Sequence, residues 1–92
     1  MPKLTIEHPH GFDQAEVRER LDALRTRLSA KYGIDASWTS DTEATFKRTG
    51  ASGSIRCQTG KVIVQVDLSF ALTPLKGQVE TRIQEELRKA LS

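Results

Sequence analysis

The residues best suited to chemistry lie together near the start of the chain, in the segment EHPHGFD (residues 7–13). His8 and His10 stand beside a carboxylate, as the residues of a metal site or a catalytic base would. On an extended strand these two histidines would point to one side and Glu7 to the other. A zinc site needs three or four ligands, but the chain has two histidines and one cysteine, Cys57. We therefore expect no metal site and no cofactor, and we interpret His8 and His10 as residues of a strand-to-helix junction.

Other potential catalytic groups lack the neighbours that catalysis needs. Cys57 alternates with Arg56 and Ser54, which indicates a small buried side chain rather than an activated thiolate. The sequence has no G-x-S-x-G elbow for a serine nucleophile. The segment GASG (50–53) has no Walker lysine and no following helix, so we interpret it as a hairpin turn rather than a phosphate loop. We expect a protein that is not an enzyme; an enzyme would need His8, His10 or acidic groups to converge in a pocket.

An amphipathic helix is predicted directly after these histidines. In FDQAEV, Asp13 is the expected N-cap, and Glu16 three residues later gives a variant of the capping box. Charged residues on the outer side form the i,i+4 pairs Glu16–Arg20 and Arg18–Asp22. Apolar residues recur at helical spacing up to an expected C-cap at Gly33: Val17, Leu21, Leu24, Leu28 and Tyr32.

A second helix is predicted at the end of the chain, beginning near LTPLKG. Thr73 is its expected cap and Pro74 its first residue, where a missing N–H has no cost. Gly77 lies inside the pattern, which predicts a close approach to the sheet or a local bend. The apolar positions follow at spacings of four: Leu75, Val79, Ile83, Leu87 and Leu91.

Between the two helices the apolar residues repeat with period two, as in strands. EATFKR (43–48) places Ala44 and Phe46 on one side, and SIRC (54–57) and ASWT (36–39) are further strands, the latter with Trp38 inward. Leu4 and Ile6, with His8, form a starting strand before the first helix. The clearest strand is KVIVQVDLSFAL (61–72), in which one face carries Val62, Val64, Val66, Leu68 and Phe70.

The connections TSDT, RTGASG and QTGK are too short for crossovers, so the strands should form an antiparallel meander. The predicted class is therefore α+β, with the order β-α-β-β-β-β-α and both helices on the apolar sheet face. The strand with Leu4 or that with Trp38 should lie at a sheet edge, where a second copy could pair to give a homodimer. A sheet that curves around the last helix can also enclose a small hydrophobic-ligand site, for which the candidate residues are Trp38, Phe46, Phe70 and Leu75.

Length and composition narrow the class of protein. The 92 residues, 37% hydrophobic and 28% charged, indicate one folded domain over residues 1–92. The net charge of +2 is small for a nucleic-acid module, and the basic residues Lys47, Arg48, Arg56 and Lys61 lack exposed aromatic partners for base stacking. No segment approaches the roughly 20 apolar residues of a membrane span. With one cysteine and no apolar leader, we expect a cytoplasmic protein with no nucleic-acid partner.

The chain as a whole resembles the small bacterial polyhydroxyalkanoic acid system proteins. The resemblance runs through LTIEHPHGFDQAEVRERLDAL, LSAKYGIDASW, FKRTGASGSIRC and VIVQVDLSFALTPLKGQVETRIQEELRKAL. Its most specific elements are the histidine and Phe-Asp pair at the helix start, the YG…W combination, F-x-R-x-G-x-x-G (46–53) and L-x-P-L-K-G. The chain departs from the family pattern after Trp38, where Thr39 and Ser40 stand in a turn.

This resemblance implies a non-enzymatic accessory or interaction protein of polyhydroxyalkanoate (PHA) storage, in the cytoplasm or at the granule surface. It brings no catalytic residues to this sequence. Because the helices bury their apolar faces in their own core, granule attachment would use the open sheet face or another granule protein. The alternative is a small carrier or sensor of an acyl group, bound between the sheet and the last helix. The meander with its long terminal helix is also similar to a reduced helix-grip domain, which is an analogy of fold alone.

Overall fold

The computed structural model describes residues 3–91 of the chain. In chain order the elements are β1 (Lys3–Pro9), α1 (Gln14–Tyr32), β2 (Asp35–Trp38), β3 (Glu43–Arg48), β4 (Ala51–Gln58), β5 (Lys61–Leu68), the 3-10 helix η1 (Phe70–Leu75) and α2 (Lys76–Ala90). The predicted α+β class and the order β-α-β-β-β-β-α are confirmed.

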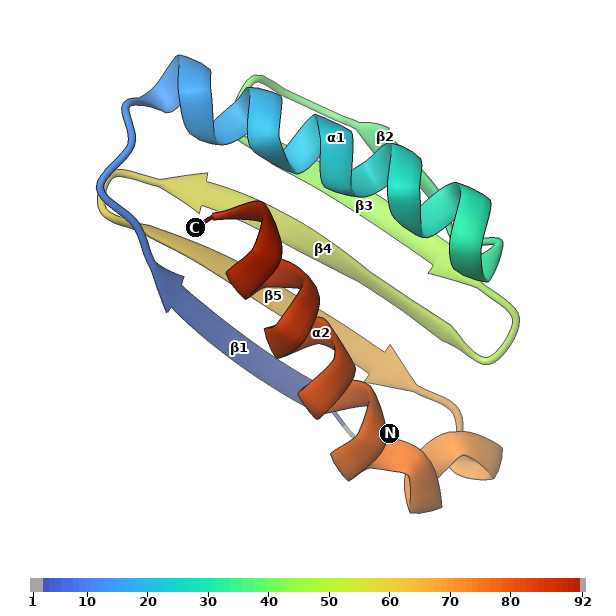
Figure 1. The fold of residues 1–92 in the computed structure, drawn as a ribbon. Coiled ribbons are helices and arrows are strands. Elements are labelled where there is room, and N and C mark those ends of the chain that lie inside the picture. Colours follow the sequence, from blue (N-terminus) through green and yellow to red (C-terminus); the bar gives the residue numbers. More distant parts are fainter. Residues whose placement is uncertain (1–2, 92) are drawn as a thin grey trace.

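The five strands form one antiparallel sheet in the order β1-β5-β4-β3-β2. Strands β2 to β5 form a meander, and β1 lies beside β5 at the edge opposite β2 (Figure 1). The two edges are therefore β1, which carries Leu4, and β2, which carries Trp38, as the sequence predicts.

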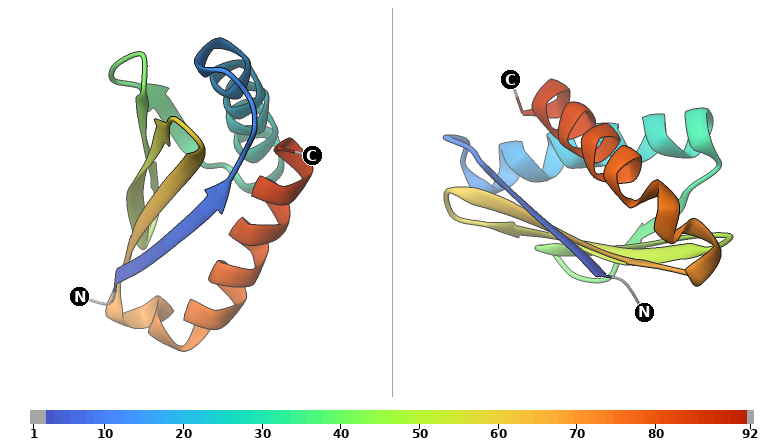
Figure 2. Two further views of the ribbon diagram at one scale, coloured as in Figure 1. Left: turned by 90° about the vertical axis from the view of Figure 1, so that its left-hand side faces the viewer. Right: turned by 90° about the horizontal axis from the view of Figure 1, so that it is seen from below.

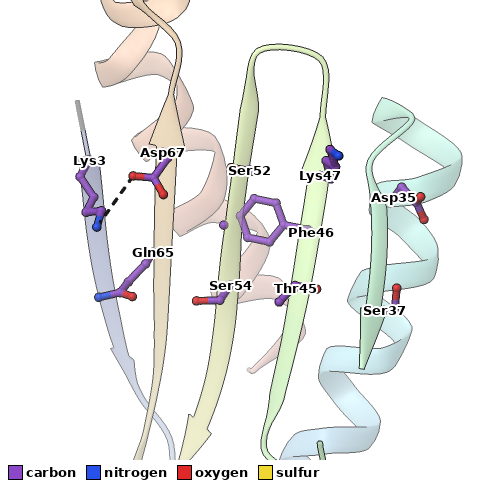
Figure 3. A pocket seen from close by; sticks show the side chains of 11 residues that line it. Lys3, Asp35, Ser37, Thr45, Phe46, Lys47, Ser52, Ser54, Gln65 and Asp67 are labelled. Atoms are coloured by element: carbon purple, nitrogen blue, oxygen red, sulfur yellow. Dashed lines mark ion pairs between the residues drawn. The ribbon is translucent and has the colours of Figure 1, made fainter. Parts of the chain in front are cut away.

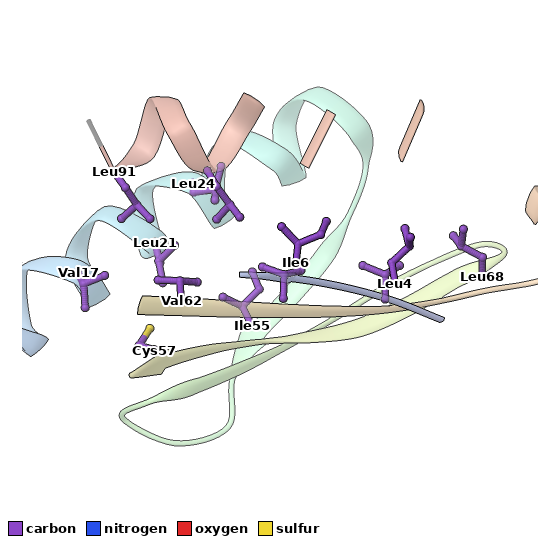
Figure 4. Close-up of a cluster of buried hydrophobic side chains, with 13 residues drawn as sticks. Leu4, Ile6, Val17, Leu21, Leu24, Ile55, Cys57, Val62, Leu68 and Leu91 are labelled. Atoms are coloured by element: carbon purple, nitrogen blue, oxygen red, sulfur yellow. The ribbon is translucent and has the colours of Figure 1, made fainter. Parts of the chain in front are cut away.

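Both helices cover the same face of the sheet, and the other face is open (Figure 2). The core between the layers is made by inward residues of β1, β4 and β5 and by the apolar stripes of α1 and α2 (Figure 4). The helices approach each other near the C-terminal end of α2, where Arg20 donates to the carbonyl of Ala90 at 3.3 Å, and they diverge toward η1 (Figure 1). No helix of residues 3–91 is long and apolar enough to cross a membrane.

The predicted limits of α1 are confirmed. Asp13 accepts a hydrogen bond from the backbone N–H of Glu16 at 2.8 Å, and Gly33 ends the helix in the left-handed conformation with φ 67°. The Glu16–Arg20 ion pair also forms, at 3.2 Å. The predicted Arg18–Asp22 ion pair is wrong, because the Asp22 carboxylate binds Arg25 at 2.9 Å while Arg18 extends toward Asp41 at 3.9 Å.

The predicted start of the last helix is wrong. Pro74 lies inside η1, and α2 begins only at Lys76. Thr73 is not a cap: its hydroxyl donates to the carbonyl of Ser69 at 3.3 Å, inside the 3-10 turn. Of the two explanations predicted for Gly77, the close approach to the sheet is wrong, because no atom beyond its chain neighbours and its own helix backbone lies within 4 Å of the position that a Cβ would take there. The local bend stays a prediction.

The assignment of Phe70 to the inward strand face is wrong as well. The N–H of Ser69 bonds to the carbonyl of Gly50 at 2.9 Å, and the N–H of Leu72 then bonds to the carbonyl of Ser69 at 3.0 Å. These bonds end β5 at Leu68 and turn the chain into η1. Phe70 is consequently 79% exposed.

The GASG segment contributes only its first residue to the turn between β3 and β4. The turn is Thr49–Gly50, and Gly50 has φ 84°, a conformation that strongly favours glycine. Ala51 to Gly53 belong to β4, so the predicted turn was too long.

Candidate ligand-binding site

An apolar cavity of about 390 Å³ lies between the sheet and the two helices. Its walls are the facing sides of α1 and α2, the inward residues of β2 to β5, and η1. This volume is in the range of small-molecule sites, about 300–1,000 Å³. Three of the residues predicted from the sequence line it: Trp38, Phe46 and Leu75. The fourth, Phe70, points into solvent and takes no part in the wall.

Trp38 is held in the cavity wall by polar contacts with α1. Its indole Nε1–H donates to Asp22 Oδ1 at 3.0 Å, and the guanidinium of Arg18 lies 4.6 Å from the ring centroid. Asp22 also accepts from Arg25 Nε at 2.9 Å. The hydrogen bond from Trp38, and then the one from Arg25, hold the pKa of the Asp22 carboxyl below its ordinary 3.8. The edge strand β2 is thereby tied to the helix, with its indole fixed at the site.

Phe46 lines the cavity because the residue opposite it in the sheet has no side chain. It is paired in register with Gly53 of β4. A Cβ on Gly53 would lie 2.7 Å from Phe46 Cζ and would collide with the backbone oxygen of Gln65. The close-up in Figure 3 shows the ring of Phe46 beside β4, where it also borders the open sheet face.

The open sheet face carries a shallow polar hollow of about 490 Å³ (Figure 3). One row across all five strands has short or neutral polar residues: Thr5, Gln65, Ser54, Thr45 and Ser37. The adjacent row is charged at both ends and includes the Lys3–Asp67 pair at 3.9 Å. This face suits contact with water or with a polar partner, whereas the apolar cavity on the other side suits a hydrocarbon group.

His10 secures the junction between β1 and α1 with both ring nitrogens. Its Nδ1 accepts from the backbone N–H of Phe12 at 3.2 Å, which leaves Nε2 as the donor to the carbonyl of Gln58 at 2.9 Å. The ring also stacks on Phe12, with centroids 6.1 Å apart. His8 makes only an exposed contact from Nδ1 to the carbonyl of Pro9 at 2.9 Å. Neither histidine lines the cavity.

Cys57 lies in the core, facing the helices from β4 (Figure 4). Burial raises the pKa of the Cys57 thiol above its ordinary 9.0, which favours the neutral form. The side chain therefore packs as a small apolar group. Within residues 3–91, no three His, Cys, Asp or Glu side chains are grouped as metal ligands would be.

A family model described as "Putative polyhydroxyalkanoic acid system protein" matches residues 4–91. The chain belongs to this family. A comparison with curated proteins gives no match. The match covers every helix and strand of the fold, from the second residue of β1 to the residue after α2.

This member of the family has charged residues at the cavity that the sequence pattern does not reveal. Glu86 of α2 is 3% exposed, and its carboxylate is bound by Arg27 at 3.0 Å and by Lys31 at 3.8 Å, both from α1. Arg48 and Arg82 line the same cavity from β3 and α2. Glu86 belongs to a run of charged residues (Glu85 to Lys89, interrupted by Leu87), which gives no sign that one member is buried.

Proposed function

We propose that this protein is a non-enzymatic accessory protein of PHA storage that acts at the granule. The observation that carries the proposal is the family match over residues 4–91. The states of the candidate catalytic groups support a role without catalysis. Both nitrogens of His10 are engaged in the junction, and the Cys57 thiol is buried and held neutral.

The surface best suited to an apolar polymer is η1. The two large apolar side chains that are most exposed in residues 3–91 both belong to it: Phe70 is 79% exposed and Leu75 is 42% exposed. The open sheet face, by contrast, carries charged side chains such as Lys3 and Asp67, whose transfer from water to polyester would cost free energy. We therefore assign granule contact to η1 rather than to the sheet.

Fractionation of PHA granules tests both parts of this proposal. Wild-type protein should sediment with washed granules, and Phe70→Ser should lower the affinity for granules about tenfold or more, measured over a series of granule concentrations, since burying a phenylalanine contributes about 1.5–3 kcal/mol. Ala71→Ser, a change at an exposed neighbour in η1, is the matched control and should leave binding unchanged. Absence of the wild-type protein from granules and from complexes with granule proteins would refute the function. Equal binding of the Phe70→Ser variant would refute only the assigned surface.

A second candidate function is the binding of an acyl group, as a carrier or sensor. The observation that favours it is the apolar cavity of about 390 Å³ beside Trp38. Titration with hydroxyacyl thioesters and fatty acids should change the fluorescence of Trp38, the chain's one tryptophan, and raise the melting temperature. If neither signal responds, the cavity is not an acyl site.

A further inference from the structure

We propose that the cavity binds an acyl chain with an anionic end, and that Arg48 and Arg82 hold the anion. This inference rests on the second candidate function and adds the polarity of the ligand. It depends on the distribution of charge around the cavity and on which of these charges are already neutralised.

The cavity is apolar where it is deep, and its exposed rim carries two arginines among neutral residues. Its buried wall is made of aliphatic side chains such as Leu21, Leu24 and Leu87, each at most 2% exposed. Arg48 and Arg82 are exposed members of the same lining. A linear amphiphile matches this arrangement, because its hydrocarbon part can leave water while its charged end stays at the rim.

Two of the four charged side chains in the lining are compensated by ionic partners. Glu86 is bound by Arg27 and Lys31, and Arg25 is bound by Asp22 at 2.9 Å.

Arg48 and Arg82 differ from Glu86 and Arg25, because they lack ionic partners in the described part of the chain. Neither has an ion pair with a carboxylate of residues 3–91. Arg82 has one neutral contact: its guanidinium donates to the hydroxyl of Tyr32 at 3.4 Å. This hydrogen bond joins α2 to the last residue of α1. The rim therefore has an excess of positive charge that an anionic ligand would balance.

Guanidinium groups bind carboxylate and phosphate oxygens in the same way, through two parallel N–H donors. The anion can therefore be the carboxylate of a free acid or a phosphate of the carrier in an acyl thioester. The shared chemistry is an acyl chain that ends in an anion at the rim.

The test compares three probes with ten-carbon chains, each below its micelle concentration or solubility limit: decanoate, decanoyl-coenzyme A and neutral decanol. Binding is followed by Trp38 fluorescence and calorimetry. We expect at least one anionic probe to bind about tenfold or more tightly than decanol, and the difference to shrink as salt is added. Binding of decanoate indicates the carboxylate as the anion, and binding of the thioester alone indicates the phosphate.

Arg48→Gln and Arg82→Gln should each weaken binding of the anionic probe about tenfold and leave decanol binding unchanged. Arg48→Lys should retain part of the affinity. Arg56→Gln is the matched control, because Arg56 lies on the open sheet face and does not line the cavity. Thermal melts establish that each variant is folded.

Two results would overturn this inference in distinguishable ways. If decanol binds as tightly as the anions and the arginine variants bind like wild type, the cavity takes acyl groups without an anionic contact, and the second candidate function stands. If no probe binds at all, that function fails together with the inference.

Discussion

At the scale of single residues, His10 illustrates how a residue suited to chemistry can serve structure. One nitrogen of its ring accepts a hydrogen bond from Phe12, in the connection just before α1, and the other donates one to the last residue of β4. The side chain thus ties the connection between β1 and α1 to the β4–β5 hairpin. An imidazole with both nitrogens engaged has no free position for a substrate or a metal ion.

His10→Ala should destabilise the fold, because it leaves the N–H of Phe12 and the carbonyl of Gln58 without their partner. Two such partly buried hydrogen bonds contribute about 1–2 kcal/mol, which would lower the melting temperature by roughly 5–15 °C. His8→Ala is the control, since His8 makes only an exposed contact with its neighbour. A His10→Ala variant that melts at the wild-type temperature would disprove this role.

Asp22 should make the free energy of unfolding depend on pH. Hydrogen bonds from Trp38 and Arg25 lower its folded-state pKa below the ordinary 3.8. The contribution is therefore fully present above the unfolded pKa and is lost as the pH falls through the lower folded value. Chemical denaturation of wild type and Asp22→Asn between pH 7 and pH 2 checks this. The variant should lose less stability than wild type over the acid part of that range, and parallel curves would contradict the prediction.

At the scale of elements, the close pairing of β4 with its two neighbours depends on Gly53. A methyl group there would meet the ring of Phe46 and the backbone of β5, and a backbone atom cannot move aside as a flexible side chain can. Gly53 is therefore a strand glycine that allows close approach.

Gly53→Ala should cost about 2 kcal/mol or more, because strand β4 must shift relative to β5 to accommodate the methyl group. Gly11→Ala is the control: no atom beyond its chain neighbours lies within 4 Å of its Cβ position, and its φ is not positive. Urea denaturation measures both variants. If the Gly53→Ala and Gly11→Ala variants have similar free energies of unfolding, the sheet accommodates the methyl group at Gly53 without loss of stability.

The contact between α1 and α2 should show coupling between Arg27 and Glu86. Arg27→Gln removes the nearest partner of the buried Glu86 carboxylate. Glu86→Gln instead removes the buried charge and leaves its cationic partners partly exposed to water. We expect Arg27→Gln to be the more destabilising change, and the double variant to cost less than the two single changes together. Unfolding by urea of all four proteins gives the coupling. Additive effects would show that this pair does not hold the helices together.

Features that depend on neighbouring residues could be predicted from the sequence, and those that depend on distant ones could not. The ends of α1 follow from Asp13 and Gly33, whose effects are local. Period-two alternation continues to Phe70, but the strand stops at Leu68 because the backbone of Ser69 bonds to Gly50 in another turn. Pro74 is compatible with the first position of an α-helix and also with a 3-10 turn. The sequence around it does not distinguish these two structures, so the predicted start of α2 is too early.

At the scale of the whole molecule, the candidate site arises where two helices on one sheet face diverge. Trp38, Phe46 and Leu75 could be found from the sequence because they are large apolar residues of predicted elements. Arg48, Arg82 and Glu86 could not, because their roles depend on how α2 approaches α1 and the end of β3, which no local pattern encodes. Whether β1 and β2 also pair with a second copy stays a prediction.

The place of β1 in the sheet has a consequence for the order of folding. Strands β2 to β5 can zip through short turns, but β1 pairs with residues more than fifty positions away, from Pro9 with Lys61 to Lys3 with Asp67. Closing such a loop costs entropy before any contact forms. We therefore expect the β4–β5 hairpin to form in the folding transition state and β1 to dock after it. In stopped-flow kinetics, Ile55→Val should then slow folding, whereas Ile6→Val should mainly speed unfolding. During synthesis, β1 would therefore wait for its partner β5 and dock among the last strands of this sheet.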